Sequence, residues 1–476
     1  MQTPSPALLR DLDVAVIGAG TAGLAAYRAA AAVTPRVVMI EAGHYGTTCA
    51  RVGCMPSKLL IAAGDAAHHA RHANPFGVSA QVSVDGRAVM DRVRRERDRF
   101  VGFVIDGVER IADDHKIHGR ARFTAPGRLE VNGQSLNARA VVVATGSSPY
   151  FPPLFEGLGD RLVINDDVFS WQTLPSSVVV FGTGVIGLEI GQALSRLGVR
   201  VRLFGRGGTV GPTSDPAVRA SLLAALREEF PLDPDAKVES VRRVGDAVEV
   251  TFEEEGRRVT ETFEYLLAAT GRKPNLKGLG LEHSGVVFDE KGRPRYDRHT
   301  LLAEGAPVFL AGDVSDDVPL LHEAADEGRI AGENAARYPE VKPGLRRSLL
   351  AVVFTEPQVA IAGETYASLA KRLDVERDLA VGEVGFDDQG RSRVMLKNKG
   401  VGRVYADRAT GRLLGAELVG PQVEHLGHLL AWSHQQGMTV GQMLTMPFYH
   451  PVVEEGLRTA LRDAAAKVSP ATTAGR

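Results

Sequence analysis

The only two cysteines of the 476-residue chain stand together in the stretch GTTCARVGCMPSK, residues 46–58. Cys49 and Cys54 would close so short a loop that a structural disulfide between them would restrict the unfolded chain very little. A zinc site needs two further ligands, and no Cys or His pair with metal-ligand spacing follows. The pair therefore indicates thiol–disulfide redox chemistry, and we expect no metal.

Composition excludes several other kinds of function. Lys+Arg 56 against Asp+Glu 58 give a net charge of −2, so no basic surplus points to nucleic acid. The sequence contains no run of about 20 apolar residues, the length that spans a membrane. Its first residues lack the basic region and apolar core of a secretory signal. With two cysteines and no export signal we expect the reducing cytoplasm, where a disulfide is more often catalytic than structural.

A dinucleotide-binding pattern lies near the N-terminus, in DVAVIGAGTAGLAAYRAAA. The apolar strand 14–17 ends in a turn with Gly18, Gly20 and Gly23 and leads into an alanine-rich helix. Glycines at these places allow a tight turn, a close approach to a pyrophosphate, and close packing of helix on strand. Glu41 ends the next strand, where a carboxylate can accept hydrogen bonds from a ribose diol.

The pattern recurs at SSVVVFGTGVIGLEIGQALSRLGVRVRLFGRGG, with Gly182, Gly184 and Gly187 after the strand 178–181. Here the second strand, 201–204, ends at Gly205 and Arg206 instead of an acid. Arg206 could bind the 2′-phosphate of NADPH, whereas the third glycine is compatible with NADH. The choice between the two nicotinamide nucleotides stays open.

Each unit is followed downstream by a strand that ends in Ala-Thr-Gly, at Thr145-Gly146 and at Thr270-Gly271. This repetition predicts a duplicated architecture in which one site holds a flavin and the other a nicotinamide. Asp313 ends a later apolar strand, where it could bind a polyol.

These motifs resemble the FAD-dependent pyridine nucleotide–disulfide oxidoreductases of class I, and among them the dihydrolipoyl dehydrogenases. The resemblance extends from residue 14 to about residue 463 and rests on GAGTAG, TCARVGCMPSK, GTGVIGLE, ATGRKPN, AGDV, VVFTEPQVA and YHPVVEEG. It implies an α/β fold with two Rossmann-like domains, for FAD and NAD(P), and a C-terminal α+β dimerisation domain.

The resemblance also implies the catalytic residues. Cys49 would be the interchange thiol that attacks the substrate disulfide, and Cys54 the sulfur next to the flavin. His450 would be the acid/base, oriented by Glu455. In the family this histidine comes from the other subunit, which implies a homodimer whose active sites are completed across the interface.

The same carry-over gives the cofactor residues, among which we expect Lys58 to lie near the isoalloxazine ring and to pair with Glu189. For FAD they are Gly18, Gly20, Gly23, Glu41, Thr48, Lys58, Gly119, Thr145, Gly146, Ser147 and Asp313. For NAD(P) they are Gly182, Gly184, Gly187, Glu189, Arg206 and Gly271.

Departures from the family pattern leave the substrate open between a small dithiol or disulfide and a lipoyl domain. Arg51 replaces the usual asparagine between the cysteines, where it would favour the thiolate of Cys49 or an anionic substrate, or would be a solvated loop residue. Alternatives are an NADPH-dependent reductase like glutathione reductase, and a diaphorase or redox sensor without disulfide turnover. A sensor needs no proton shuttle, so His450 and Glu455 argue against it. Mercuric reductase fits less well, because no cysteine pair remains near the C-terminus.

The motifs predict the domain limits. We expect an FAD domain at 1–150 that resumes at 276–345, a nicotinamide domain at 151–275, and an interface domain at 346–476 with a disordered C-terminal tail. In the interface domain we expect strands at 390–398, 401–407 and 413–420, and then helices.

Overall fold

The computed structural model of the protein describes residues 10–469, and the chain divides into two compact units. The first consists of residues 1–56, 93–150 and 272–346, and the second of residues 57–92, 151–271 and 347–476. The tail predicted to be disordered lies beyond residue 469, outside the described residues. Among residues 10–469, none of the helices combines the length and apolar character that a membrane crossing requires.

A seven-stranded sheet forms the centre of the first unit, with the strand order β3-β2-β1-β6-β5-β4 and β17 paired with β6. The strands β3, β2, β1, β6 and β17 run parallel, so their carboxyl ends meet at one edge, where α/β folds bind ligands. The strands are β1 (Arg10–Ile17), β2 (Val37–Glu41), β3 (Lys116–His118), β4 (Arg122–Ala125), β5 (Arg128–Val131), β6 (Gln134–Val143) and β17 (Val308–Leu310).

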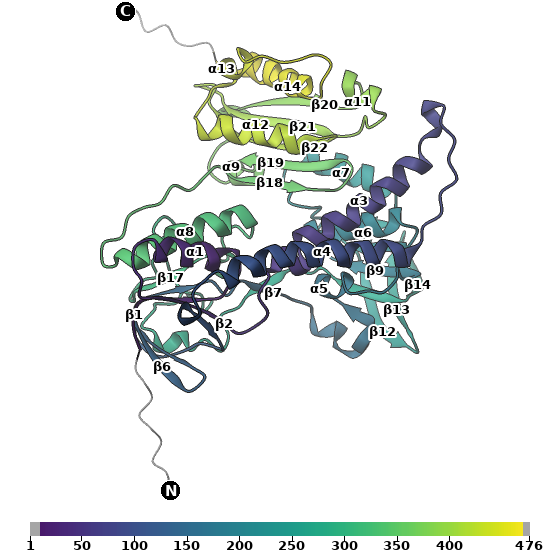
Figure 1. Ribbon diagram of the computed structural model, residues 1–476. Coiled ribbons are helices and arrows are strands. Elements are labelled where there is room, and N and C mark those ends of the chain that lie inside the picture. Colours follow the sequence, from purple (N-terminus) through teal and green to yellow (C-terminus); the bar gives the residue numbers. More distant parts are fainter. Residues whose placement is uncertain (1–9, 470–476) are drawn as a thin grey trace, which may run out of the picture. The chain divides into compact units, whose positions relative to one another are not determined.

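The first unit has an apolar core on each face of this sheet. Along β1, Val14 and Val16 belong to one core, whereas Ala15 and Ile17 belong to the other, as the two-residue period of a strand requires. Helices α1 (Thr21–Ala31) and α8 (Leu321–Arg337) lie side by side over the first of these faces (Figure 1). They approach closely, because a Cβ at Gly328 would lie 2.1 Å from a backbone oxygen of α1.

Further elements of the first unit carry the two cysteines and the segment around Ser147. Helix α2 (Thr48–Val52) holds the first cysteine, and helix α3 (Cys54–Arg71) begins at the second. Strands β7 (Ser147–Pro149) and β16 (Arg272–Pro274) form an antiparallel pair. Helices α3 and α4 (Gly86–Glu109) contribute residues to both units.

The second unit begins with a parallel sheet of order β11-β10-β9-β15-β8, in which β9, α6 and β10 repeat the arrangement of β1, α1 and β2. A three-stranded antiparallel sheet shares a core with it. The elements are β8 (Leu162–Val163), α5 (Asn165–Val168), β9 (Ser177–Phe181), α6 (Val185–Arg196), β10 (Arg200–Phe204), α7 (Pro216–Arg227), β11 (Leu232–Asp233), β12 (Val238–Val244), β13 (Ala247–Glu254), β14 (Arg257–Phe263) and β15 (Tyr265–Ala268).

An antiparallel sheet of order β18-β19-β22-β21-β20 forms the C-terminal part of the second unit. Helices α12, α13 and α14 share one core with it, and α12 lies along the sheet in Figure 1. The elements are β18 (Leu350–Val353), β19 (Gln358–Gly363), α9 (Tyr366–Ala370), α10 (Val375–Asp378), β20 (Leu379–Gly385), α11 (Gly390–Val394), β21 (Val401–Asp407), β22 (Leu413–Gly420), α12 (Val423–Gln435), α13 (Val440–Leu444) and α14 (Glu454–Lys467).

The prediction of a strand at 390–398 was wrong, because this segment begins with the short helix α11. The Gln389 side chain caps the helix by accepting hydrogen bonds from the Ser392 amide and hydroxyl, both at 2.8 Å. Of the three consecutive apolar residues in this segment, Val394 and Leu396 do not face a core, since they are 60% and 48% exposed, and only Met395 packs against the C-terminal core. The strands predicted at 401–407 and 413–420 are β21 and β22.

Candidate dinucleotide sites and redox residues

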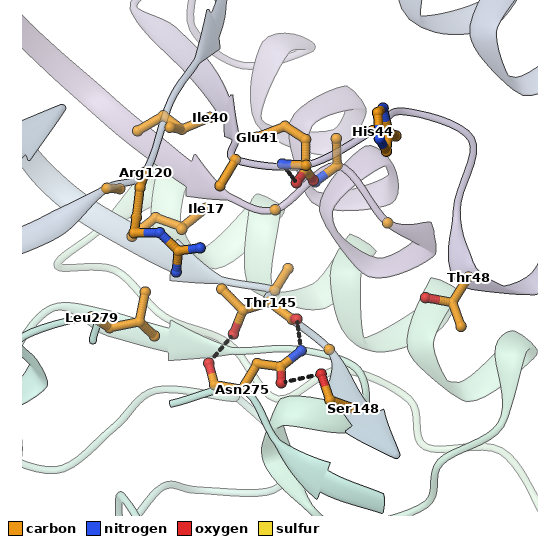
Figure 2. A pocket seen from close by; sticks show the side chains of 18 of the residues that line it. Ile17, Ile40, Glu41, His44, Thr48, Arg120, Thr145, Ser148, Asn275 and Leu279 are labelled. Atoms are coloured by element: carbon orange, nitrogen blue, oxygen red, sulfur yellow. Dashed lines mark hydrogen bonds between the residues drawn. The ribbon is translucent and has the colours of Figure 1, made fainter. Parts of the chain in front are cut away.

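A cavity of about 480 Å³ opens at the carboxyl ends of β1, β2 and β6 (Figure 2). It brings together residues that lie more than 100 positions apart in the sequence, from the turn after β1 to Asn275. Most of the residues predicted to bind the flavin nucleotide line it: Gly18, Gly20, Glu41, Thr48, Gly119, Thr145 and Gly146. Gly23, Lys58, Ser147 and Asp313 are not part of this lining.

Glu41 is fixed at the cavity wall by two backbone amides. Ala19 donates to Oε2 at 2.7 Å, and Gly43 donates to Oε1 at 2.7 Å. Each carboxylate oxygen keeps a further lone pair, so Glu41 can still accept hydrogen bonds from a ligand hydroxyl. Gly119 donates its amide to the Glu41 carbonyl at 2.8 Å, which leaves its carbonyl as the backbone group that a ligand could use.

The first glycine turn has the geometry of a dinucleotide cradle. A Cβ at Gly18 would lie 2.3 Å from the Ala144 oxygen, and a Cβ at Gly23 would lie 1.9 Å from the Gly18 oxygen. At Gly20, by contrast, a Cβ would have no protein atom within 4 Å. Two glycines are therefore needed for packing, and the third keeps open the space through which a pyrophosphate would approach the N-terminus of α1.

The second glycine turn repeats this geometry. A Cβ at Gly182 would lie 2.2 Å from the Ala269 oxygen, one at Gly187 would lie 1.9 Å from the Gly182 oxygen, and Gly184 has open space around it. The strand that precedes Ala269 returns to the turn as the strand before Ala144 does. The duplication predicted from the sequence is therefore present in the structure.

The glycine geometry makes a prediction about stability. Gly23→Ala should destabilise the fold by about 3 kcal/mol, near the upper end of overpacking costs, because the new methyl group meets backbone. Gly20→Ala should leave the unfolding free energy almost unchanged, because it has room and an extended conformation (φ −75°). Urea unfolding of the two variants measures both effects, and equal midpoints would contradict this assignment.

Asn275 was not singled out from the sequence, although it ends the ATGRKPN motif. Its side-chain amide donates to the Thr145 carbonyl at 2.9 Å, and its Oδ1 accepts from the Ser148 hydroxyl at 2.8 Å (Figure 2). Thr145 donates its hydroxyl to the Asn275 carbonyl at 2.8 Å. Asn275 therefore holds the 145–148 segment at the cavity wall.

Asp313 and Ser147 are in contact with each other, and Arg272 braces the pair. The Ser147 hydroxyl donates to Asp313 Oδ2 at 2.7 Å, while Arg272 donates from Nε to the Ser147 hydroxyl at 2.8 Å. The turn before Asp313 is fixed by the buried Glu327, whose Oε2 accepts from the Gly312 amide at 2.7 Å. Arg272 lies in the ATGRKPN motif but was not singled out, and Glu327 gave no signal in the sequence.

The cysteine-bearing helix α2 forms part of the cavity wall. Thr48 and Arg51 line the cavity on either side of the half-buried Cys49. Thr47 caps the helix by accepting a hydrogen bond from the Ala50 amide at 3.2 Å. Cys54 is exposed at the start of α3. Within the described part of the chain, no group of His, Cys, Asp and Glu side chains could hold a metal ion.

Lys58 forms the ion pair with Glu189 that the sequence predicted, with Nζ 2.7 Å from Oε2. The other oxygen of Glu189 accepts from the Phe354 amide at 2.9 Å. Both oxygens of this buried carboxylate are thus engaged within the protein, and Glu189 holds Lys58 in place.

The end of β10 differs from the end of β2 in one decisive residue. Ile17 pairs with Ile40 in the first unit and Phe181 pairs with Phe204 in the second, so Gly205 takes the place of Glu41. A Cβ at Gly205 would lie 2.7 Å from the Pro234 carbonyl oxygen, which excludes an acid there. Arg206 follows as an exposed residue, and Gly271 ends the neighbouring segment with φ +114°.

His450 and Glu455 form the predicted pair, with Nδ1 3.0 Å from Oε2. The hydrogen bond from His450 lowers the pKa of Glu455, so the carboxylate is ionised at neutral pH and holds the Nδ1 proton. Nε2 is then the nitrogen that can exchange a proton with another group. The His450 side chain is 80% exposed.

Two dinucleotide-type βαβ units in one chain suit an enzyme that moves electrons between two dinucleotide cofactors, and the fold thus defines a flavoprotein oxidoreductase. The sequence matches the pyridine nucleotide-disulphide oxidoreductase family over residues 12–328 and the dimerisation domain of that family over residues 350–461. The chain belongs to this family.

Relatives match this chain over nearly its whole length. The dihydrolipoyl dehydrogenase of Thermus scotoductus is 31% identical, with 95% of this chain and 97% of that protein covered. The mercuric reductase of Bacillus cereus is 30% identical and covered over 71% of its length, with 95% of this chain matched. LpdA from Mycobacterium tuberculosis has the same fold, with a TM-score of 0.80 at 26% identity over 94% of this chain and 98% of LpdA.

These matches confirm several predictions from the sequence. They confirm the fold class, the assignment to the FAD-dependent pyridine nucleotide–disulfide oxidoreductases with their likeness to dihydrolipoyl dehydrogenases, and FAD and NAD(P) as cofactors. The dimerisation domain supports the predicted homodimer. The individual site residues and the domain limits remain predictions.

Proposed function

We propose that the protein catalyses dithiol–disulfide exchange like a dihydrolipoyl dehydrogenase, through a redox-active disulfide between Cys49 and Cys54. The observation that carries this proposal is the place of α2, which presents Thr48 and Arg51 to the dinucleotide cavity with Cys49 between them. A cysteine pair held at a cofactor site is suited to redox exchange.

FAD would occupy the cavity of the first unit. Glu41 would hold the adenosine ribose, the turn with Gly18 and Gly20 and the N-terminus of α1 would take the pyrophosphate, and Asp313 with Ser147 would hold the ribityl chain. When bound, FAD supplies two-electron transfer between the nicotinamide and the cysteine pair. Arg51 lines the same cavity, so in this proposal its charge serves the FAD phosphates.

In the direction of disulfide reduction, thiol–disulfide exchange would take place in two steps. The Cys49 thiolate attacks one sulfur of the substrate disulfide, forms a mixed disulfide and releases the first thiol. The Cys54 thiolate then attacks the Cys49 sulfur, closes the Cys49–Cys54 disulfide and releases the second thiol. Oxidation of a dithiol substrate runs through the same steps in reverse.

His450 would hold and return the proton in these steps. Its Nε2 would protonate each leaving thiolate, while Glu455 keeps the proton on Nδ1 and stabilises the imidazolium. We propose that this pair serves Cys49 of the partner subunit in the homodimer.

A second candidate function is favoured by Gly205 and Arg206, namely an NADPH-dependent reductase of a small disulfide. An acid at position 205 would repel a 2′-phosphate, but the Pro234 carbonyl oxygen leaves no room for a side chain at Gly205. Arg206 is the next residue. In either candidate the nicotinamide would lie against Gly182, Gly184, Gly187 and Gly271.

Steady-state turnover tests both candidates when lipoamide and glutathione disulfide are crossed with NADH and NADPH. Dihydrolipoamide oxidation with NAD would support the first candidate, and turnover only with NADPH and a disulfide would support the second. Turnover of neither substrate, with diaphorase activity intact, would contradict both.

Arg206→Ala gives a prediction about coenzyme choice. It should raise the KM for NADPH by about 10-fold or more, because a hydrogen bond to a charged group contributes about 1.5–3 kcal/mol. The KM for NADH should stay unchanged, since NADH lacks the phosphate. Equal effects on the two coenzymes would show that Arg206 does not contact the 2′-phosphate.

The domain limits follow from this assignment. We propose an FAD domain at 1–150 and 276–345, a nicotinamide domain at 151–275 and an interface domain from 346 onward.

The reducing cytoplasm is the proposed compartment, because it keeps an exchangeable cysteine pair reducible. A small dithiol or a lipoyl domain would be the substrate.

A further inference from the structure

Helix α6 carries three buried polar side chains on one face. Glu189, Gln192 and Arg196 are each at most 4% exposed, and their spacing of three and four residues places them one above another. Buried polar groups are costly unless they are hydrogen-bonded. The partners of these three residues therefore show what the face is built to hold.

The first contact holds Lys58. Glu189 binds its Nζ with Oε2 and accepts the Phe354 amide with Oε1. The Phe354 ring also lies under Lys58, with Nζ 4.7 Å from the ring centroid. Segment 354–356 thus touches both members of the ion pair, and a shift of this segment would move the carboxylate that orients Lys58.

The second contact fixes segment 354–356 itself. Gln192 accepts the Glu356 amide with Oε1 at 2.8 Å and donates from Nε2 to the Glu356 carbonyl at 2.7 Å. A side-chain amide suits this contact, because it donates from its nitrogen and accepts at its oxygen. The contact is to the backbone of Glu356, so it sets the position of the segment whatever the side chain does.

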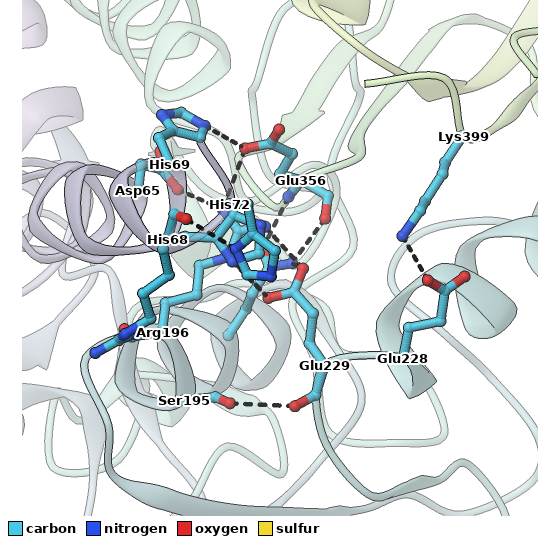
Figure 3. A network of polar contacts seen from close by, with 12 residues as sticks. Asp65, His68, His69, His72, Ser195, Arg196, Glu228, Glu229, Glu356 and Lys399 are labelled. Carbon is cyan, nitrogen blue, oxygen red and sulfur yellow. Dashed lines mark hydrogen bonds and ion pairs between the residues drawn. The ribbon is translucent and has the colours of Figure 1, made fainter. Parts of the chain in front are cut away.

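The third contact is an ion cluster around Arg196 (Figure 3). Its guanidinium binds Glu229 with two nitrogens at 2.7 and 2.8 Å, Asp65 at 2.6 Å and Glu356 at 3.1 Å. Asp65 lies two turns beyond Lys58 on α3, so the cluster also anchors that helix.

The charges in this cluster are compensated at neutral pH. Burial opposes ionisation of Glu356, but Lys397, 2.9 Å away, and Arg196 lower the pKa of Glu356 to about 2. Burial likewise opposes the charge of Arg196, yet Glu229, Glu356 and Asp65 raise its pKa. Because Glu356 and Arg196 are both charged at neutral pH, their ion pair anchors the segment there.

We propose that Gln192 and Arg196 are positioning residues for the Lys58–Glu189 ion pair, which they hold through segment 354–356. This segment lies within residues 350–461, which match the dimerisation domain, so that domain would set the orientation of Lys58. The inference rests on the proposed function, in which the protein binds FAD, and on the expectation from the family resemblance that Lys58 lies near the isoalloxazine ring.

The test compares the FAD-loaded wild-type protein with four variants, by visible flavin spectrum, flavin midpoint potential and thermal midpoint. Glu189→Gln removes the charge beside Lys58. Gln192→Met keeps the side-chain size but removes both backbone hydrogen bonds, and Arg196→Lys keeps the charge but loses the two-nitrogen contact. Ile190→Val, a buried change on the same helix, is the control for lost stability without lost polar contacts.

We expect Glu189→Gln to shift the flavin spectrum and potential, and Gln192→Met and Arg196→Lys to shift both in the same direction by a smaller amount. Ile190→Val should lower the thermal midpoint and shift neither. If Glu189→Gln shifts the flavin while the variants at 192 and 196 only lower the thermal midpoint, the positioning role is refuted and the proposed function stands. If Glu189→Gln leaves the flavin spectrum and potential unchanged, the ion pair does not act on the flavin and the positioning role is refuted, whereas the exchange chemistry proposed for Cys49 and Cys54 is untouched and is tested separately by turnover. Arg196→Lys keeps the test decisive should Gln192→Met fail to fold.

Discussion

Cys49→Ser should abolish turnover of lipoamide or any other disulfide substrate, while diaphorase activity with a quinone acceptor stays at the wild-type level. The loss should be at least about 10³-fold, because removal of a covalent nucleophile leaves only the non-covalent part of catalysis. Electron transfer from the nicotinamide through FAD to a quinone needs no thiol. Both activities can be measured on one preparation, so misfolding is recognised by loss of both.

Cys54→Ser is the matched variant, since it removes the other sulfur of the same turn. The reduced variant still has the Cys49 thiolate, which should attack a disulfide substrate, release one thiol and stop at a mixed disulfide. Mass spectrometry should find on Cys49 of each chain one half of an acyclic substrate such as glutathione disulfide, or the whole molecule of cyclic lipoamide, whose second thiol stays tethered, and neither adduct on Cys49→Ser. A stable adduct on Cys54 of the Cys49→Ser protein would show that the two roles are reversed.

The sequence predicted the dinucleotide units well because several of their constraints leave a readable pattern. Gly23 and Gly187 are needed where the helix packs on the preceding turn, a contact within one turn and helix. Gly18 and Gly182 are needed where the turn meets the returning segment at Ala144 and Ala269. The glycine spacing and the recurring Ala-Thr-Gly motif therefore reveal both kinds of contact. The Lys58–Glu189 and His450–Glu455 pairs were predicted for a different reason, namely a family pattern in the surrounding motifs.

The residues that the sequence did not reveal act across long separations. Gln192 holds the backbone of Glu356, and Glu327 holds the turn before Asp313. A glutamine on an amphipathic helix looks the same whether it faces solvent or a buried amide. The strand wrongly predicted at 390–398 failed similarly, since three apolar residues in a short segment do not show whether a core lies beside them. For Arg51 the sequence left several roles open, and only the fold places it at the dinucleotide cavity.

His450→Gln should lower disulfide turnover by about 10²–10⁴-fold, the usual contribution of a general acid–base, again with diaphorase activity retained. The same variant tests whether the active site is shared between subunits. In a mixed dimer of one Cys49→Ser chain and one His450→Gln chain, a shared arrangement places both substitutions in one site and leaves the other site wild-type. Each mixed dimer should then have half of the wild-type turnover, although both parent proteins are inactive.

The turnover of the mixed dimer distinguishes a site shared between two subunits from a site formed by one chain alone. If His450 served Cys49 of its own chain, each site of the mixed dimer would contain one substitution, and mixing would restore nothing. Dimers of two differently tagged chains can be purified through both tags, so the measured turnover belongs to mixed dimers alone. Recovered turnover would also assign the exposed His450–Glu455 pair to a thiol of the neighbouring subunit, which explains why a catalytic imidazole is held on the surface of its own chain.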